Sequence, residues 1–330
     1  MENRALTLKF WGVRGSLPAP LTPAALEAKI TQIVRNALIT GVAPEAIEDW
    51  LKNQPRHAVS TYGGNTSCIE LRADGRLVAI DMGSGMRELG NALMSELLGR
   101  GSLDATVLVS HVHWDHIQGF PFFGPIYVPR GKAQVNLDLW GGVNWRRPLK
   151  SVLAEQMSSP MFPMDFKKVE QEGAKMRFHT VNDRLTFAIP APEGDIRVLC
   201  RRLNHPQETY GFRFEYCGRI VAYCTDNEDF PIPDPALVEL VTGADVWIQD
   251  CQYDNGEYKG EKGGPPKLNW GHSEPEYVGR VAALAHPKLI ITFHHDPQAS
   301  DAHIAAIASE VRKLSGVPTE AAYEGKIISV

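Results

Sequence analysis

Three histidines and one aspartate fall within six positions of the chain, at His111, His113, Asp115 and His116. Imidazole nitrogens and carboxylate oxygens, with no thiolate beside them, suit zinc, manganese or iron rather than a structural zinc site rich in cysteine. Packed structural histidines rarely occur at this spacing. The cluster therefore predicts a metal site.

The segments on either side of this cluster place it where a strand ends. Residues 105–110 are short, apolar and β-branched, which is typical of a buried strand. Residues 116–123 lose that pattern at once. We therefore expect the four polar side chains at the rim of a sheet, where a rigid backbone can hold ligands around an ion.

Ionisable residues also follow several other predicted strands, at Asp81, His205, Asp226, Asp250 and His294. Such residues converge on one edge of an open sheet, which is where ligands bind. The number of ligands fits two neighbouring metal ions. The predicted ligands divide into a first set (His111, His113, His205), a second set (Asp115, His116, His294) and one bridging carboxylate, Asp226. A hydroxide between the ions would complete both sites, because the metals would lower the pKa of the bound water towards about 7.

The elements that must position these residues alternate between strands and helices, which predicts an α/β fold. Strand patterns cover residues 6–11, 68–72, 77–81, 197–203, 209–216, 219–225, 245–250 and 288–293. Helical patterns cover residues 86–98, 148–157, 275–285 and 301–314. A helical segment over residues 20–58 is expected to be an insertion, and residues 131–181 are expected to form a lid. No linker separates the halves, so residues 1–330 are expected to form a single domain.

Composition narrows the class of protein. The chain has 330 residues, of which 43% are hydrophobic, and a net charge of -5, which gives no electrostatic reason to expect a nucleic-acid partner. No apolar run is long enough to cross a bilayer, and the N-terminus lacks a signal-peptide core. Five scattered cysteines fit a reduced protein. We therefore expect a cytoplasmic protein without a membrane partner, and a homodimer is left open.

The pattern His-x-His-x-Asp-His at 111–116, with His205, Asp226 and His294 after it, resembles the metallo-β-lactamase-fold hydrolase superfamily. The resemblance covers nearly the whole chain. It implies a four-layer αβ/βα sandwich with a dinuclear site at one edge. Asp81 resembles the acidic turn that supports the ligands in that superfamily.

Differences between this sequence and other branches of the superfamily restrict the reactions that the resemblance implies. Flavodiiron oxidoreductases have a glutamate where His113 stands, and dizinc β-lactamases usually have a cysteine where Asp226 stands. Asp250, with the later Gly-His272-Ser segment, resembles tRNA 3′-processing endonucleases and related cyclic phosphodiesterases. This resemblance implies that His272 is a general acid held by Asp250.

Motifs at residues 11–16, 62–67, 111–119 and 294–297 resemble a bacterial subgroup usually labelled cyclic-phosphate or cyclic-nucleotide phosphodiesterase-like. The leading prediction is a dinuclear metal phosphodiesterase that hydrolyses a small, cyclic phosphodiester by attack of the bridging hydroxide. Zinc is the expected metal, with manganese or iron as alternatives. The predicted catalytic residues are Asp115, His272 and Asp250.

Other interpretations stay open. The chain could be a tRNA 3′-processing endoribonuclease, a thioester or lactone hydrolase, or a metal-binding scaffold without catalysis. His272 could instead cap the helix that follows it. The strand pattern favours His294 over His295 as the ligand, which leaves His295 as a supporting or substrate contact. Arg14 and Asn65 are expected to structure their loops rather than to contact phosphate.

Overall fold

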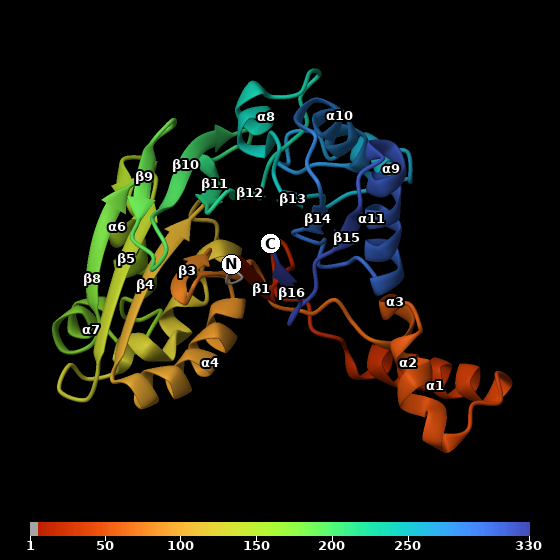
Figure 1. Ribbon diagram of the computed structural model, residues 1–330, viewed down its shortest axis with the longest axis horizontal. Helices are drawn as coiled ribbons and strands as arrows, with labels where there is room; N and C mark the ends of the chain where they lie inside the picture. Colours follow the sequence, from red (N-terminus) through yellow and green to blue (C-terminus); the bar gives the residue numbers. More distant parts are fainter. Residues whose placement is uncertain (1–5) are drawn as a thin grey trace.

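Two seven-stranded sheets carry the fold in the computed structural model, which describes residues 6–330 (Figure 1). The first sheet contains, in spatial order, β16 (Ile327–Ser329), β1 (Leu6–Gly12), β2 (Cys68–Ala73), β3 (Arg76–Ile80), β4 (Ser102–Val109), β5 (Gln134–Gly141) and β8 (Lys175–Thr180). The second sheet contains β15 (Thr319–Ala321), β14 (Ile290–Phe293), β13 (Val246–Asp250), β12 (Arg219–Cys224), β11 (Thr209–Tyr216), β10 (Ile196–Leu203) and β9 (Thr186–Ile189). A small hairpin joins β6 (Val143–Asn144) to β7 (Arg147–Pro148).

Helices lie on the outer face of each sheet. The first sheet is covered by α4 (Gly85–Arg100), α6 (Leu149–Gln156), α7 (Phe166–Glu172) and the short η2 (Phe120–Phe122) and η3 (Gly124–Tyr127). The second sheet is covered by α8 (Pro235–Val241), α10 (Pro275–Ala285) and α11 (Asp301–Ser315). Two short helices lie in loops at the ends of strands, α5 (Trp114–Ile117) and α9 (Asn255–Lys259).

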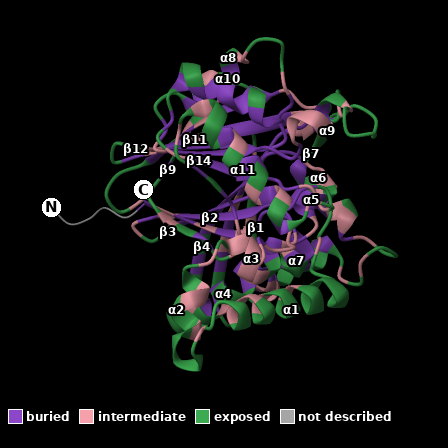
Figure 2. Cartoon of the chain, turned by 90° about the vertical axis from the view of Figure 1, so that its right-hand side faces the viewer, coloured by how far each residue is buried: buried purple, intermediate pink, exposed green. Residues whose placement is uncertain are grey.

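Three clusters of buried apolar side chains fill the spaces between these layers (Figure 2). Leu93 of α4 and Val107 of β4 belong to the cluster under the first layer of helices. Leu8 and Phe212 belong to the cluster between the two sheets, and Trp247 belongs to the cluster under α8, α10 and α11. The order helix, sheet, sheet, helix confirms the predicted αβ/βα sandwich.

Strand β4 shows why a continuous apolar run was the correct signal for a buried strand. Leu103, Val107 and Val109 contact the layer of helices, whereas Leu108 points into the space between the sheets. A strand that is buried on both faces needs apolar residues on both faces. Strands β3, β4, β5 and β8 run parallel, as do β12, β13, β14 and β15. Their carboxyl ends therefore lie at a common edge of each sheet.

The segment over residues 20–58 is helical, as predicted. It contains α1 (Pro23–Ile39), η1 (Pro44–Ala46), α2 (Ile47–Lys52) and α3 (Arg56–Val59), and it projects from the body of the molecule (Figure 1). The side chain of Thr22 accepts a hydrogen bond from the backbone N–H of Ala25, which caps the first turn of α1. No residue of α1 is buried (Figure 2). The Lys29 ammonium attaches this helix to the body through the Asp301 carboxylate.

A lid over the whole of residues 131–181 is not what the structure contains. Residues 134–141 form β5 and residues 175–180 form β8, and both strands belong to the first sheet. The intervening helices α6 and α7 contribute Leu153 and Val169 to the cluster of buried side chains under the sheet. The range is therefore a strand–helix–helix–strand unit of the fold, and the prediction of a lid was wrong.

Two expectations about the environment of the protein can be compared with the structure. Among residues 6–330, no helix is both long and apolar enough to cross a membrane. Residues 1–5, on which part of the expectation about the N-terminus rested, lie outside the described residues. All five cysteines are free thiols, and of these only Cys217 is exposed.

Candidate metal centre

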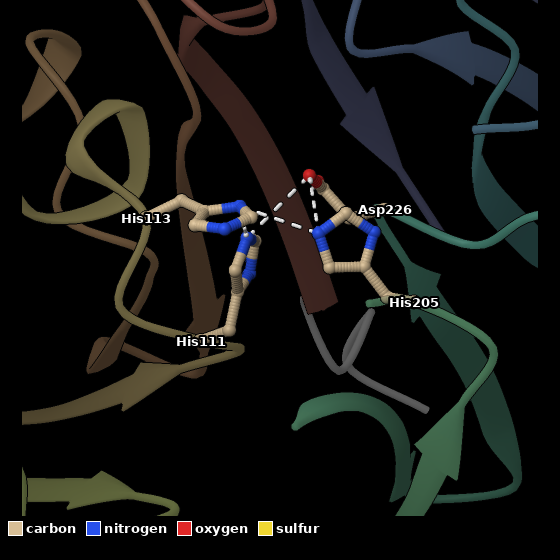
Figure 3. Close-up of side chains that lie close together, drawn as sticks. All are labelled: His111, His113, His205 and Asp226. Atoms are coloured by element: carbon tan, nitrogen blue, oxygen red, sulfur yellow. Dashed lines mark hydrogen bonds and ion pairs between the residues drawn. The ribbon is translucent and has the colours of Figure 1, made fainter. Parts of the chain in front are cut away.

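The first ligand set and Asp226 meet where two sheets present the ends of their strands (Figure 3). His111 follows β4 and His113 precedes α5, whereas His205 follows β10 and Asp226 follows β12. His111 Nε2 lies 2.9 Å from His113 Nδ1, which in turn lies 3.2 Å from His205 Nε2. His111 Nε2 is also 3.5 Å from Asp226 Oδ2. Four ligand atoms from three chain segments therefore converge on one point.

The second ligand set lies on the other side of Asp226. His116 Nε2 is 3.2 Å from His294 Nε2, and the latter atom is 3.1 Å from Asp115 Oδ2. Asp226 Oδ1 lies 3.1 Å from His116 Nε2 and 3.2 Å from His294 Nε2. Asp226 thus directs one oxygen to each ligand set, so the structure brings all seven predicted ligands together.

Hydrogen bonds on the outer nitrogens fix which nitrogen of each ring faces inward. Three of these bonds are from His116 Nδ1 to Asp81 Oδ2 (2.8 Å), from His294 Nδ1 to Gln252 Oε1 (2.9 Å) and from His205 Nδ1 to the carbonyl oxygen of Gly271 (3.0 Å). A neutral imidazole that donates through Nδ1 presents an unprotonated Nε2. Each of these rings is therefore oriented as an N-donor ligand, in the way that supporting residues orient metal-bound histidines.

The buried negative charge of the centre also favours the binding of cations. The carboxylates of Asp81, Asp115 and Asp226 are buried, and no Lys or Arg of residues 6–330 pairs with them. Burial opposes a charge on His116, yet the carboxylates of Asp226, Asp115 and Asp81 outweigh it and raise the pKa of His116 well above its usual value. Buried carboxylates without basic partners are costly unless a cation compensates them. Two sets of inward nitrogens and oxygens around such carboxylates fit divalent metal ions.

Asp81 holds the first sheet's part of the centre in place. It accepts hydrogen bonds from the backbone N–H of Ser110 (2.7 Å) and from the Tyr223 hydroxyl (2.6 Å), in addition to that from His116. Its φ is 60°, and those of Asp226 and His294 are 41° and 57°. Left-handed backbone is uncommon for residues other than glycine, and it concentrates where the surrounding structure imposes it. The chain therefore turns sharply at three of the strand ends that form the centre.

Two glycines allow the backbone to lie directly against ligand rings. A Cβ atom on Gly271, where φ is 91°, would lie 2.1 Å from His205 Nδ1. A Cβ atom on Gly15 would lie 2.4 Å from His294 Nδ1. These close approaches explain the glycines in the motifs around residues 11–16 and 270–273.

His272 and Asp250 form a buried pair next to the second ligand set. His272 Nδ1 lies 2.9 Å from Asp250 Oδ2, and the His272 ring stacks on that of His294 with 5.0 Å between centroids. Burial alone would lower the pKa of His272, but the Asp250 carboxylate outweighs burial and raises this pKa to about 9. Among the described residues, no group makes a hydrogen bond with His272 Nε2. The pair can therefore present a proton from its inner nitrogen.

Two other motif residues have structural roles, as expected. The Arg14 guanidinium donates to the carbonyl oxygens of Gly63, Asp296 and Ala299, so it ties loops together. Asn65 bonds with Glu324 and Ser84.

His295 points away from both ligand sets. Its Nε2 bonds with the carbonyl oxygen of Ala322 at 2.9 Å, and burial lowers its pKa to about 3. The ring is buried and bonds with the backbone, which favours the supporting role over contact with substrate.

Sequence reasoning missed several residues that support the ligands. Gln252 follows β13 by two positions and orients His294, and the backbone N–H of Ser16 donates to Asp115 Oδ2 at 2.7 Å. Tyr223 lies within β12 and reaches Asp81 across the space between the sheets. Gln252 could have been found by including neutral polar residues among the strand ends. Tyr223 carried no signal of that kind.

Replacement of Gln252 by alanine is expected to weaken metal binding by roughly 10- to 100-fold, the usual effect of removing a partner of a metal-bound histidine. The reason is that His294 Nδ1 loses its acceptor, so the ring loses its fixed orientation. Competition with a chromophoric chelator measures the affinity. Gln252→Glu keeps an acceptor oxygen and should bind metal at least as tightly as the native protein. Equal affinities for all three proteins would contradict this role of Gln252.

Comparison with known proteins agrees with this geometry. The sequence profile of the beta-lactamase superfamily domain matches residues 76–295. Among curated proteins, Ribonuclease Z from Prochlorococcus marinus (strain MIT 9515) is 26% identical over 163 residues, which cover 49% of this chain and 47% of that protein. The chain therefore spans about half the length of the curated relatives that it matches.

Solved structures share the fold over nearly the whole chain. The metallo-beta-lactamase fold protein YhfI from Bacillus subtilis has a TM-score of 0.62 at 14% identity, with 99% of this chain and 100% of that chain covered. A diphosphatase from the PhnP family has a TM-score of 0.59 at 19% identity, with coverages of 99% and 97%. The match over residues 76–295 shows that this chain belongs to the beta-lactamase superfamily, and the four layers and the solved structures show that it has the metallo-β-lactamase fold.

Proposed function

We propose that the protein is a phosphodiesterase that uses two divalent metal ions and hydrolyses a small, cyclic phosphodiester. The observation that carries this proposal is the buried Asp250–His272 pair, whose free nitrogen lies beside two complete ligand sets. Hydrolysis of a phosphodiester with an alkoxide leaving group needs a proton donor at the leaving oxygen. Within a fold shared by many hydrolases, this pair supports the choice of phosphodiesters.

The two ligand sets would hold the metals, with Asp226 shared between them. When bound, divalent cations supply charge neutralisation at the phosphoryl oxygens and an activated water at neutral pH. Zinc is the metal that we expect first, because imidazole with carboxylate suits it, and manganese or iron is compatible with the same donors.

Side chains of the protein would transfer the proton to the leaving group. Asp250 keeps the Nδ1–H of His272 directed towards itself, so that Nε2 can donate a proton to the leaving oxygen. Asp115 is held by the backbone N–H of Ser16 and by its contact with His294, which keeps this carboxylate directed at the other residues of the second ligand set. The carbonyl oxygen of Gly271 bonds with His205, so the backbone next to His272 is tied to the first ligand set.

A second candidate function is cleavage of RNA, in the manner of a tRNA 3′-processing endoribonuclease. It is favoured by the match to a relative named Ribonuclease Z over about half of that protein. Our expectation that nucleic acid is not a partner, which rested on the net charge of -5, receives no support from such relatives. RNA therefore belongs among the substrates to be tested.

The test begins with metal analysis of freshly purified protein and continues with hydrolysis of bis(p-nitrophenyl) phosphate in added zinc or manganese. We expect turnover that is lost after treatment with a chelator and restored by metal. Cyclic mononucleotides, linear dinucleotides and a tRNA with a 3′ extension then identify the substrate. Lack of turnover of every phosphodiester, with thioester or lactone hydrolysis by the same metal-loaded protein, would overturn the proposal.

A further inference from the structure

The loop that precedes His272 presents an exposed aromatic ring and a cation. Trp270 leaves 52% of its surface exposed, although it is only two residues before the proposed proton donor. The Lys267 ammonium lies 4.0 Å from the centroid of the Trp270 ring. An exposed indole offers a flat face on which a base can stack.

Lys267 differs from its neighbours in having no acidic partner. Lys259 pairs with Glu276 at 2.8 Å, and Lys262 pairs with Asp254. Within residues 6–330, no carboxylate lies within ion-pair distance of the Lys267 ammonium, whose recorded contacts are the faces of two aromatic rings. Its charge is therefore available to an anionic ligand.

Aromatic contacts connect this pair to the proposed proton donor. The Lys267 ammonium lies 5.7 Å from the ring centroid of Tyr253, which is 5.9 Å from the ring centroid of His272. The carbonyl oxygen of Gly271 bonds with His205 of the first ligand set. The indole and the ammonium thus belong to the loop that carries His272, and Tyr253 contacts both the ammonium and the His272 ring.

The backbone of this loop does not depend on the Trp270 side chain. Glu228 is a buried acceptor for the backbone N–H groups of Asn269 and Gly271, the latter at 2.9 Å. The Lys267 N–H donates to the carbonyl oxygen of Tyr258 at 2.9 Å. Because Glu228 and Tyr258 fix the loop, the exposed indole is left free for a ligand.

We infer that Trp270 and Lys267 form a subsite for the leaving group, in which the indole stacks on a nucleobase and the ammonium contacts a further phosphate. This inference rests on the proposed phosphodiesterase function. It names the substrate class as a nucleotide whose leaving nucleoside carries a phosphate beyond the one that is cleaved. Stacking on aromatic side chains accepts any base, and lysine binds phosphate as a point charge.

The test measures kcat/KM of the metal-loaded protein on a matched series of adenosine dinucleotides. The series contains ApA, its two analogues that lack one base, and pApA and ApAp, which add a phosphate at either end. The product released without the cleaved phosphate identifies the leaving nucleoside. Trp270→Ala should lower kcat/KM for ApA by roughly 10- to 100-fold, the range for loss of one stacked base. It should change kcat/KM by less than about twofold for the analogue that lacks the leaving base.

Lys267→Ala should lower kcat/KM only for the dinucleotide whose added phosphate lies on the leaving nucleoside. Lys262→Ala is the matched control, because this lysine is on the same loop but is neutralised by Asp254, and it should act like the native protein. Trp270→Phe should retain most of the native activity. The cyclic dinucleotide of adenosine is tested beside the linear dinucleotides, because its leaving nucleoside also carries a second phosphate. The two values of kcat/KM show whether the subsite serves a cyclic or a linear substrate.

Two results would overturn the inference while leaving the phosphodiesterase proposal intact. One is hydrolysis of bis(p-nitrophenyl) phosphate by a protein that cleaves no member of the dinucleotide series. The other is cleavage of the series with the same kcat/KM in the native, Trp270→Ala and Lys267→Ala proteins. If bis(p-nitrophenyl) phosphate is itself not hydrolysed, the proposed function fails first.

Discussion

Replacement of Asp226 by asparagine is expected to lower the metal occupancy of both proposed sites. It should also lower phosphodiester hydrolysis by more than about 100-fold, which exceeds the usual loss for a supporting residue. Asp226 directs Oδ1 to the second ligand set and Oδ2 to His111 of the first. The asparagine side chain has the same shape but lacks the charge and offers only one oxygen. Elemental analysis of the gel-filtered protein gives the number of metal ions per chain.

Single substitutions in each ligand set are the matched controls for this prediction. His205→Ala removes a ligand from the first set, and His294→Ala removes one from the second. Each should reduce the metal content by one ion per chain, whereas Asp226→Asn affects both sites. Two bound ions per chain in Asp226→Asn, with native hydrolysis, would contradict the bridging role of this carboxylate. Circular dichroism confirms that each variant is folded before its metal content is compared.

Replacement of His272 by alanine is expected to have an effect that depends on the leaving group. A cyclic nucleotide or dinucleotide releases an alkoxide, which needs a proton, so its kcat should fall by roughly 100- to 10,000-fold. Bis(p-nitrophenyl) phosphate releases a stable phenolate, so its kcat should fall far less. Measuring kcat for both substrates on the same preparation gives the difference directly.

Asp250→Asn tests whether the acid acts as a pair. The amide cannot hold a protonated imidazole as the carboxylate does, so this variant should show the same leaving-group dependence as His272→Ala, with a smaller loss. A ring nitrogen of His272 lies within 4.8 Å of ligand atoms of Asp226 and His294, so the structure also allows His272 to be a ligand. Equal losses on both substrates, together with a lower metal content, would identify it as a ligand instead of an acid.

Sequence patterns pointed to residues that the structure brings together, and at several of these residues two independent signals coincide. His111, Asp226 and His294 all combine a metal-binding side chain with a place directly after a buried apolar strand. The helices that flank the sheets carry explicit start signals, such as Pro275 at the beginning of α10 and Ser300 before α11. These start signals depend on the local sequence and not on the rest of the fold.

The mistaken lid has a physical cause in the sequence of β5. Asn136, Asp138 and Trp140 alternate with the buried residues Val135, Leu137 and Leu139, and this face of the strand is only partly covered. Strand β8 continues the pattern with polar residues at the edge of the sheet. Such strands lack the continuous apolar run of β4, but the alternation over residues 134–140 is the pattern of a half-buried strand, and the prediction of a lid did not take it into account.

Contacts across the space between the two sheets could not be predicted from the sequence either. Tyr223 touches Asp81 although they are separated by 142 positions, and its place in β12 resembles that of any buried aromatic residue. Glu228 likewise fixes the 269–271 turn from a distant loop. Residue type indicates what a side chain can bind, but only the register and packing of the two sheets decide which partner it meets.

The origin of the ligands in both sheets has a consequence for metal exchange. The stretch 111–116 follows a strand of the first sheet, whereas His205, Asp226 and His294 follow strands of the second. Ions held by the proposed ligands would therefore act as cross-links between two layers that are otherwise held together by apolar packing. The free energy of metal binding adds to the free energy of keeping these layers together. Exchange of a bound ion would therefore change the stability of the contact between the two sheets, and the unfolding temperature should rise with metal concentration.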